Sequence, residues 1–223
     1  MDSPKETVVD KFLEGTKASL GALPGGSMVT FLLDQIIRPP ILKRTQEWMR
    51  QVSELLNAHD IKINDLSSNE RFITTFIQAS QIAARNHQEE KLVALRNAVI
   101  NSIETPSYSE SLQIHFLHLI DRFTEWHIRV IRIFRDRNWL TEGGIKEFGS
   151  GKEVTMRVIE KQYPYLNDHR HRQFTELILS DLREARLIYT EWDSATSVAI
   201  ERSASTPTLT SIGIDFLEFI NKK

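Results

Sequence analysis

Residues 187–189, LIY, and residues 208–217, TLTSIGIDFL, decide the fold of the C-terminal part of the chain. The first stretch alternates in polarity and predicts a short strand, and residues 208–210 predict a returning strand. A polar, turn-rich ribbon lies between them at residues 190–206. The spacing of the next apolar residues predicts a closing amphipathic helix over residues 212–220. They are Phe216, Leu217, Phe219 and Ile220.

Two helices are expected before these strands. Residues 152–162 have helical spacing and end before Pro164, which cannot continue a helix. Asn167 or Asp168 is a suitable N-cap for a longer helix that reaches Ala185. The predicted order is therefore helix, helix, strand, ribbon, strand, helix.

This order resembles that of winged-helix domains. The stretch DLREARLI at 181–188 is similar to the end of their second long helix and the first wing strand. The stretch at 208–217 is similar to their T-x-L-T-x-x-G-x-x-F-L return. Two departures are that no glycine opens the long helix, and that the ribbon at 192–205 has Arg202 as its one base. The resemblance implies a fold rather than a function, because winged helices bind DNA or proteins.

The preceding part of the chain has helical periodicity throughout. Helices are expected over residues 41–56, from Ser68 or Asn69 to 103, and over 112–134. The polar run at 85–91 is either a solvated turn of one long helix or a junction of two. The fold class is thus mainly α: an N-terminal helical bundle (1–136) and a small C-terminal winged-helix-like domain (137–223) with a short β-ribbon.

The N-terminal part also resembles uncharacterised bacterial helical proteins. The resemblance rests on an apolar Pro-Gly-Gly segment, on PPxxKRxxxW at 39–48 and on HQEEKxxALRNAV at 87–99. It brings no assigned activity with it.

The composition narrows the class of protein. The chain has 223 residues, of which 40% are apolar and 26% charged, and a net charge of −2. That apolar content is too high for an intrinsically disordered chain. The absence of cysteine excludes disulfides and thiolate metal sites, and it favours a reducing, cytoplasmic location.

An apolar segment at residues 18–33 carries no charge. It is interrupted at residues 24–26 by Pro-Gly-Gly, and it is shorter than the roughly 20 residues that span a membrane. It is expected to be either part of the core or a segment that contacts a partner or a membrane surface peripherally. Its candidate contact residues are Leu20, Leu23, Met28, Phe31 and Leu32.

Two basic groups form a candidate interaction surface. Their members are Arg129, Arg132, Arg135, His169, Arg170, His171 and Arg172. Glu176, Asp181 and Glu184 follow on the predicted long helix and would repel a DNA backbone. A protein partner or a second copy of the chain is therefore expected, in preference to nucleic acid.

No catalytic, cofactor-binding or metal-binding set is predicted. His115 and His118 have i, i+3 spacing without a placed third ligand, and the glycines at 143–151 match no phosphate-binding motif. The expected function is a non-enzymatic bacterial protein-interaction or regulatory module. The alternatives are a membrane-acting effector using residues 18–33 and a DNA-binding regulator.

Overall fold

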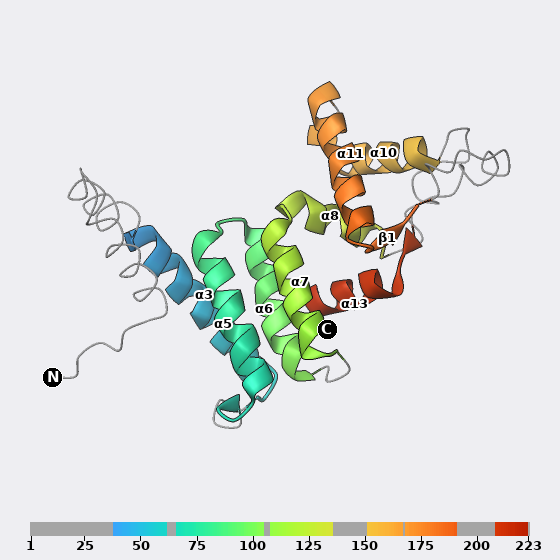
Figure 1. Cartoon of the computed structure of the whole chain (residues 1–223). Helices are drawn as coiled ribbons and strands as arrows, with labels where there is room; N and C mark the ends of the chain where they lie inside the picture. Colours follow the sequence, from blue (N-terminus) through green and yellow to red (C-terminus); the bar gives the residue numbers. More distant parts are fainter. Residues whose placement is uncertain are drawn as a thin grey trace, which may run out of the picture. The chain divides into compact units, whose positions relative to one another are not determined.

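The computed structural model describes residues 38–61, 66–104, 108–135, 151–166, 168–190 and 208–222. These residues are mainly helical, with one small antiparallel sheet of two strands (Figure 1). The chain divides into two compact units, Met1–Leu117 and His118–Lys223. The candidate segment at residues 18–33 lies outside the described residues, as does the predicted boundary at 136/137.

The first unit consists of helices that begin where the sequence offers a cap. Asn69 accepts a hydrogen bond at 3.1 Å from the amide of Phe72, as a helix N-cap does. Two prolines occupy the first turn of the first described helix, where a missing amide costs no helical bond. The described helices are α3 (Arg38–Ala58), α5 (Glu70–Arg85), α6 (Glu89–Glu104) and the start of α7 (Glu110–Arg122).

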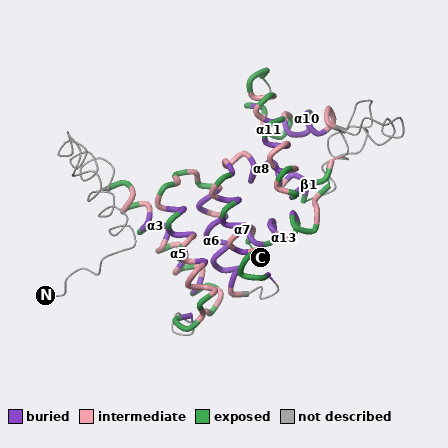
Figure 2. Tube along the Cα trace, in the orientation of Figure 1, coloured by how far each residue is buried: buried purple, intermediate pink, exposed green. Residues whose placement is uncertain are grey.

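The core of the first unit forms where α3, α5 and α6 pack against one another. Trp48 is 1% exposed, and its indole Nε1 donates a hydrogen bond at 3.2 Å to the carbonyl of Leu92. Its ring lies 6.0 Å from that of Phe76. Ala79 and Ala83 are fully buried on α5, where their small side chains allow the neighbouring helices to approach closely. Figure 2 shows buried and exposed residues alternating along these helices.

The second unit has the element order predicted from the sequence. Ile188 pairs with Leu209 and Tyr189 with Thr208 in the antiparallel sheet. After the end of α7, the unit contains α8 (Glu125–Ile133), α10 (Gly151–Gln162), the 3₁₀ turn η2 (Pro164–Leu166), α11 (His169–Glu184), β1 (Ile188–Tyr189), β2 (Thr208–Leu209) and α13 (Ser211–Ile220). The two predicted strands and the closing helix are confirmed.

Two helix junctions test the predictions for residues 85–91 and for residues 112–134. The polar run at 85–91 joins two helices, because α5 ends at Arg85 and α6 begins at Glu89. The prediction of one helix over 112–134 is wrong, because α7 ends at Arg122 and α8 begins at Glu125. Thr124 is the N-cap of α8, and its amide donates at 3.1 Å to His127 Nδ1. This local bond competes with helix continuation, although the apolar spacing runs on unbroken.

The division between the two compact units lies between Leu117 and His118. Residues 118–135, assigned to the bundle from the sequence, belong to the second compact unit. Within that unit α8 packs on α11. In the described part of the chain, no helix is long and apolar enough to cross a membrane.

The end of α11 is joined closely to the start of α13. Arg186 has a left-handed backbone (φ 56°), and the amide of Leu187 donates at 3.0 Å to Leu182 O, which closes the helix in a Schellman motif. The amide of Thr210 then donates at 3.0 Å to the carbonyl of Leu187, and its hydroxyl accepts at 3.0 Å from Gly213 N–H. A Cβ on Gly213 would lie 1.9 Å from Leu187 O. Only glycine therefore allows this approach.

Gly213→Ala should lower the free energy of unfolding by about 2–3 kcal/mol, because the added methyl group would displace backbone. Denaturant unfolding followed by circular dichroism measures this loss. Ser211→Ala, an exposed change on the same helix, is the control and should have little effect. Equal stability of Gly213→Ala and the parent would contradict the close approach.

Arg186→Gly should raise the free energy of unfolding by about 1 kcal/mol, because glycine adopts the left-handed conformation without the steric cost of a Cβ. Glu184→Gly, at the last residue of α11, should lower it instead, because glycine disfavours the helical conformation that this residue adopts. Opposite signs for the two variants in thermal unfolding are the expected result. A loss of stability in both would argue against the Schellman geometry.

Candidate functional site

The basic cluster at 169–172 lies at the start of α11. Two of its four side chains, His171 and Arg172, form ion pairs within the second unit. Asp168 Oδ1 accepts hydrogen bonds at 2.9 Å from the amides of Arg170 and His171. Its second oxygen lies 2.5 Å from His171 Nδ1. The amide of His171 and its side-chain hydrogen bond lower the pKa of the Asp168 carboxyl. The N-terminus of α11 is thus already occupied by an anionic cap.

Arg172 links α11 to α10. Its guanidinium lies 2.6 Å from a Glu153 oxygen and 3.6 Å from Glu160. The hydrogen bond from Arg172 lowers the pKa of the Glu153 carboxyl. This arginine therefore holds two helices together, whereas His169 and Arg170 are exposed.

The second basic group, on and after α8, is also engaged in part. The Arg129 guanidinium lies 4.8 Å from the centre of the Trp126 ring and 3.5 Å from Glu125. Arg132 Nε donates at 3.0 Å to Asn221 Oδ1, at the end of α13. Arg135 is exposed. The three arginines predicted to share a surface thus have different surroundings.

An aromatic stack that was not predicted from the sequence lies beside these bases. The Trp126 ring is nearly parallel to that of Tyr165 (11°, centroids 6.1 Å apart) and perpendicular to that of Tyr163 at 5.4 Å. The ring of Tyr165 lies 4.3 Å from His171. Tyr165 is 66% exposed. In the sequence the two tyrosines flank Pro164 shortly before the basic cluster, and this proximity is a signal that could have indicated the stack.

The exposed side of α11 carries an apolar residue at its centre. Leu177 is 55% exposed, and Gln173, one turn earlier, is also exposed. The neighbouring Glu176 forms an ion pair at 3.2 Å with Lys152 of α10. The predicted basic surface therefore changes along the helix into an apolar and acidic one.

His127 is buried between α8 and α11 and has a structural role. It is 4% exposed, stacks on Phe123 at 4.7 Å, and its Nε2 lies 3.1 Å from Asp181 Oδ2. Because the Thr124 amide can only donate, Nδ1 accepts and Nε2 carries the hydrogen that Asp181 accepts. The arrangement ties the start of α8 to the second half of α11.

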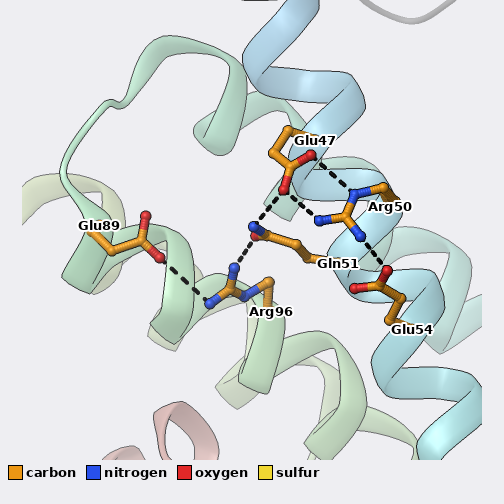
Figure 3. Close-up of polar contacts among 6 residues, drawn as sticks. All are labelled: Glu47, Arg50, Gln51, Glu54, Glu89 and Arg96. Atoms are coloured by element: carbon orange, nitrogen blue, oxygen red, sulfur yellow. Dashed lines mark hydrogen bonds and ion pairs between the residues drawn. The ribbon is translucent and has the colours of Figure 1, made fainter.

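In the first unit, the polar stretch at 87–91 contributes to a network between α6 and α3 (Figure 3). Arg96 hydrogen-bonds to Gln51 and lies 3.5 Å from Glu89, while Gln51 donates at 2.8 Å to Glu47. The hydrogen bond from Arg50 lowers the pKa of the Glu47 carboxyl. These contacts join two helices and place no nucleophile beside a base.

The histidine pair at His115 and His118 lies exposed on α7. Over the residues whose structure is described, no group of three or more histidine, aspartate or glutamate side chains is arranged to hold a metal ion.

Glu153→Gln should lower the free energy of unfolding at pH 7 by about 0.5 kcal/mol, because it removes a partly exposed ion pair. The Glu153 carboxyl has a lower pKa in the folded state, so its contribution is complete above the ordinary glutamate pKa. It is lost as the pH falls through the folded-state pKa. The difference from the parent, measured by urea unfolding, should therefore vanish in acid.

Glu184→Gln is the matched control, since Glu184 is exposed on α11 and forms no ion pair with the described residues. It should leave the stability unchanged at both pH values. A Glu153→Gln effect that stays constant into acid would show that the charge of Glu153 is not its cause.

The comparisons with known proteins find no significant match to this chain. No family model matches it, and neither a curated protein nor a solved structure is significantly similar to it. Its function is therefore argued from the surfaces described above.

Proposed function

We propose that the chain is a non-enzymatic protein-interaction or regulatory module, and that its second unit is a winged-helix-like domain that binds protein. One observation carries the proposal. The centre of α11, the helix that would be the recognition helix of such a domain, exposes Leu177, while Arg172 at its start is paired with glutamates of α10.

The order of elements supports the winged-helix assignment. Helices α10 and α11 are followed by the antiparallel pair β1 and β2 and by α13, the order that the sequence resemblance implies. Thr210 and Gly213, both in the T-x-L-T-x-x-G return, make the contacts that attach α13 to Leu187. These two residues thus have a structural reason to occupy their places in the motif.

The charges on α11 favour protein over DNA. A helix that lies in the major groove needs free cations along its length for phosphates. Here the one arginine on α11 that pairs with no described residue is Arg170, at the second position of the helix. Glu176 and Glu184 follow on its exposed side. A protein surface can accommodate an apolar side chain flanked by carboxylates, whereas a phosphate backbone repels the carboxylates.

A photocrosslinking amino acid at position 177, introduced into the full chain in its host cells, tests the partner surface. The expected result is a discrete crosslinked product whose second component, identified by mass spectrometry, crosslinks back to α11 when it is labelled in turn. The control position is Gln81, exposed on α5 in the first unit, and should give no such product. Equal products from both positions, or none from position 177, would contradict the proposal.

Duplex DNA should bind the chain no more tightly than about micromolar at physiological salt, because few cations are available for phosphate contacts. A fluorescence-anisotropy titration at several salt concentrations measures this. Tight binding with a steep salt slope that Arg170→Ala reduces would instead make the protein a DNA-binding regulator.

A further inference from the structure

The aromatic stack of the second unit is a ladder of four side chains, with Tyr163 at its side. Arg129 lies over Trp126, Trp126 lies parallel to Tyr165, and Tyr165 contacts His171. The members come from α8, η2 and α11, so the ladder is built by the tertiary fold. Tyrosine, tryptophan and arginine are the side chains that most often dominate binding energy at protein interfaces.

Near the ladder, the carboxylates form ion pairs within the unit, whereas some of the cations do not. The two carboxylates beside it are engaged, Glu125 with Arg129 and Asp168 with His171. Two cations that neighbour it along the chain, Lys161 at the end of α10 and Arg170 next to His171, are exposed and form no ion pair with any described residue. The free charge at this surface is therefore positive, although the chain as a whole has a net charge of −2.

We infer that this ladder binds an acidic peptide segment of a partner protein. An apolar or aromatic side chain of the peptide packs against Tyr165, and its carboxylates meet Lys161 and Arg170. The inference rests on the proposed protein-interaction function and names the chemistry of the partner. Charge complementarity at a rim around an aromatic anchor sets orientation and specificity in such interfaces.

Single-stranded nucleic acid, the other polyanion that uses aromatic rings, fits this surface less well. Base stacking needs open ring faces, but Trp126 already contacts Arg129, Tyr163 and Tyr165, and Tyr165 contacts His171 as well. A peptide can place its carboxylates only where the cations are.

A random dodecapeptide phage library, selected on the full chain at low salt, tests the inference. The expected outcome is enrichment of peptides that combine carboxylates with an aromatic or aliphatic residue. Tyr165→Ala should raise the Kd of a selected peptide about tenfold. Arg170→Glu should raise the Kd at least as much and should make the Kd depend less on salt concentration. Tyr189→Ala, which truncates another exposed tyrosine of the same unit (57% exposed), is the matched control and should leave Kd unchanged.

Several outcomes would overturn the inference. These are failure to enrich any peptide, enrichment of peptides without carboxylates, an equal loss in Tyr165→Ala and Tyr189→Ala, or displacement of a selected peptide by labelled oligo-dT. Circular dichroism of each variant shows that it is folded. A product crosslinked from position 177 together with no peptide binding would leave the proposed function standing and reject this inference alone. Peptide binding at Tyr165 without a position-177 product would reject the α11 surface instead.

Discussion

The carbonyl group of Leu187 is the point on which the second unit depends. It accepts a hydrogen bond from the amide of Thr210, whose hydroxyl donates at 2.5 Å to the neighbouring carbonyl of Arg186. Helix α13 begins against Leu187 because Gly213 has no side chain. The Schellman closure of α11 fixes the position of Leu187 itself. From this contact α13 extends so that Phe216 lies edge-on to Phe123, with centroids 6.3 Å apart, and buries Phe219 and Ile220. A few backbone contacts thus determine how the strands and the closing helix enclose the core.

Much of this fold was predictable because its signals are local. Periodic apolar residues, the caps at Asn69 and Asp168, and the prolines after α10 and at the start of α3 locate helices without knowledge of tertiary contacts. The break at Thr124 was missed because the apolar spacing continues through it. The hydrogen bond at the break is donated by the Thr124 amide and accepted by the side chain of His127, an unusual residue at that capping position. Apolar periodicity does not locate a helix end at which a side chain accepts the amide hydrogen bond that a backbone carbonyl would otherwise accept.

The candidate site was less predictable for a different reason. The sequence shows that Arg172 is basic, but its partner Glu153 lies 19 residues away on another helix, so only folding reveals that the charge is compensated. The stack of Trp126 on Tyr165 likewise joins α8 to η2 across the unit. Two arginines of this unit connect separate elements, Arg172 with Glu153 and Arg132 with Asn221, while Leu177 on α11 and Tyr165 in η2 are exposed. That division of roles is what favours a protein partner.

The position of α7 has a consequence for dissecting the chain. This helix runs from Glu110 to Arg122, while the two compact units meet between Leu117 and His118, so one continuous helix belongs to both. A fragment cut at the division would lose backbone hydrogen bonds on both sides of the cut, because each helical amide bonds four residues back. Recombinant halves divided at 117/118 would therefore have frayed helix termini there. Fragments that keep residues 110–122 whole in each half, overlapping along α7, preserve the helix in both.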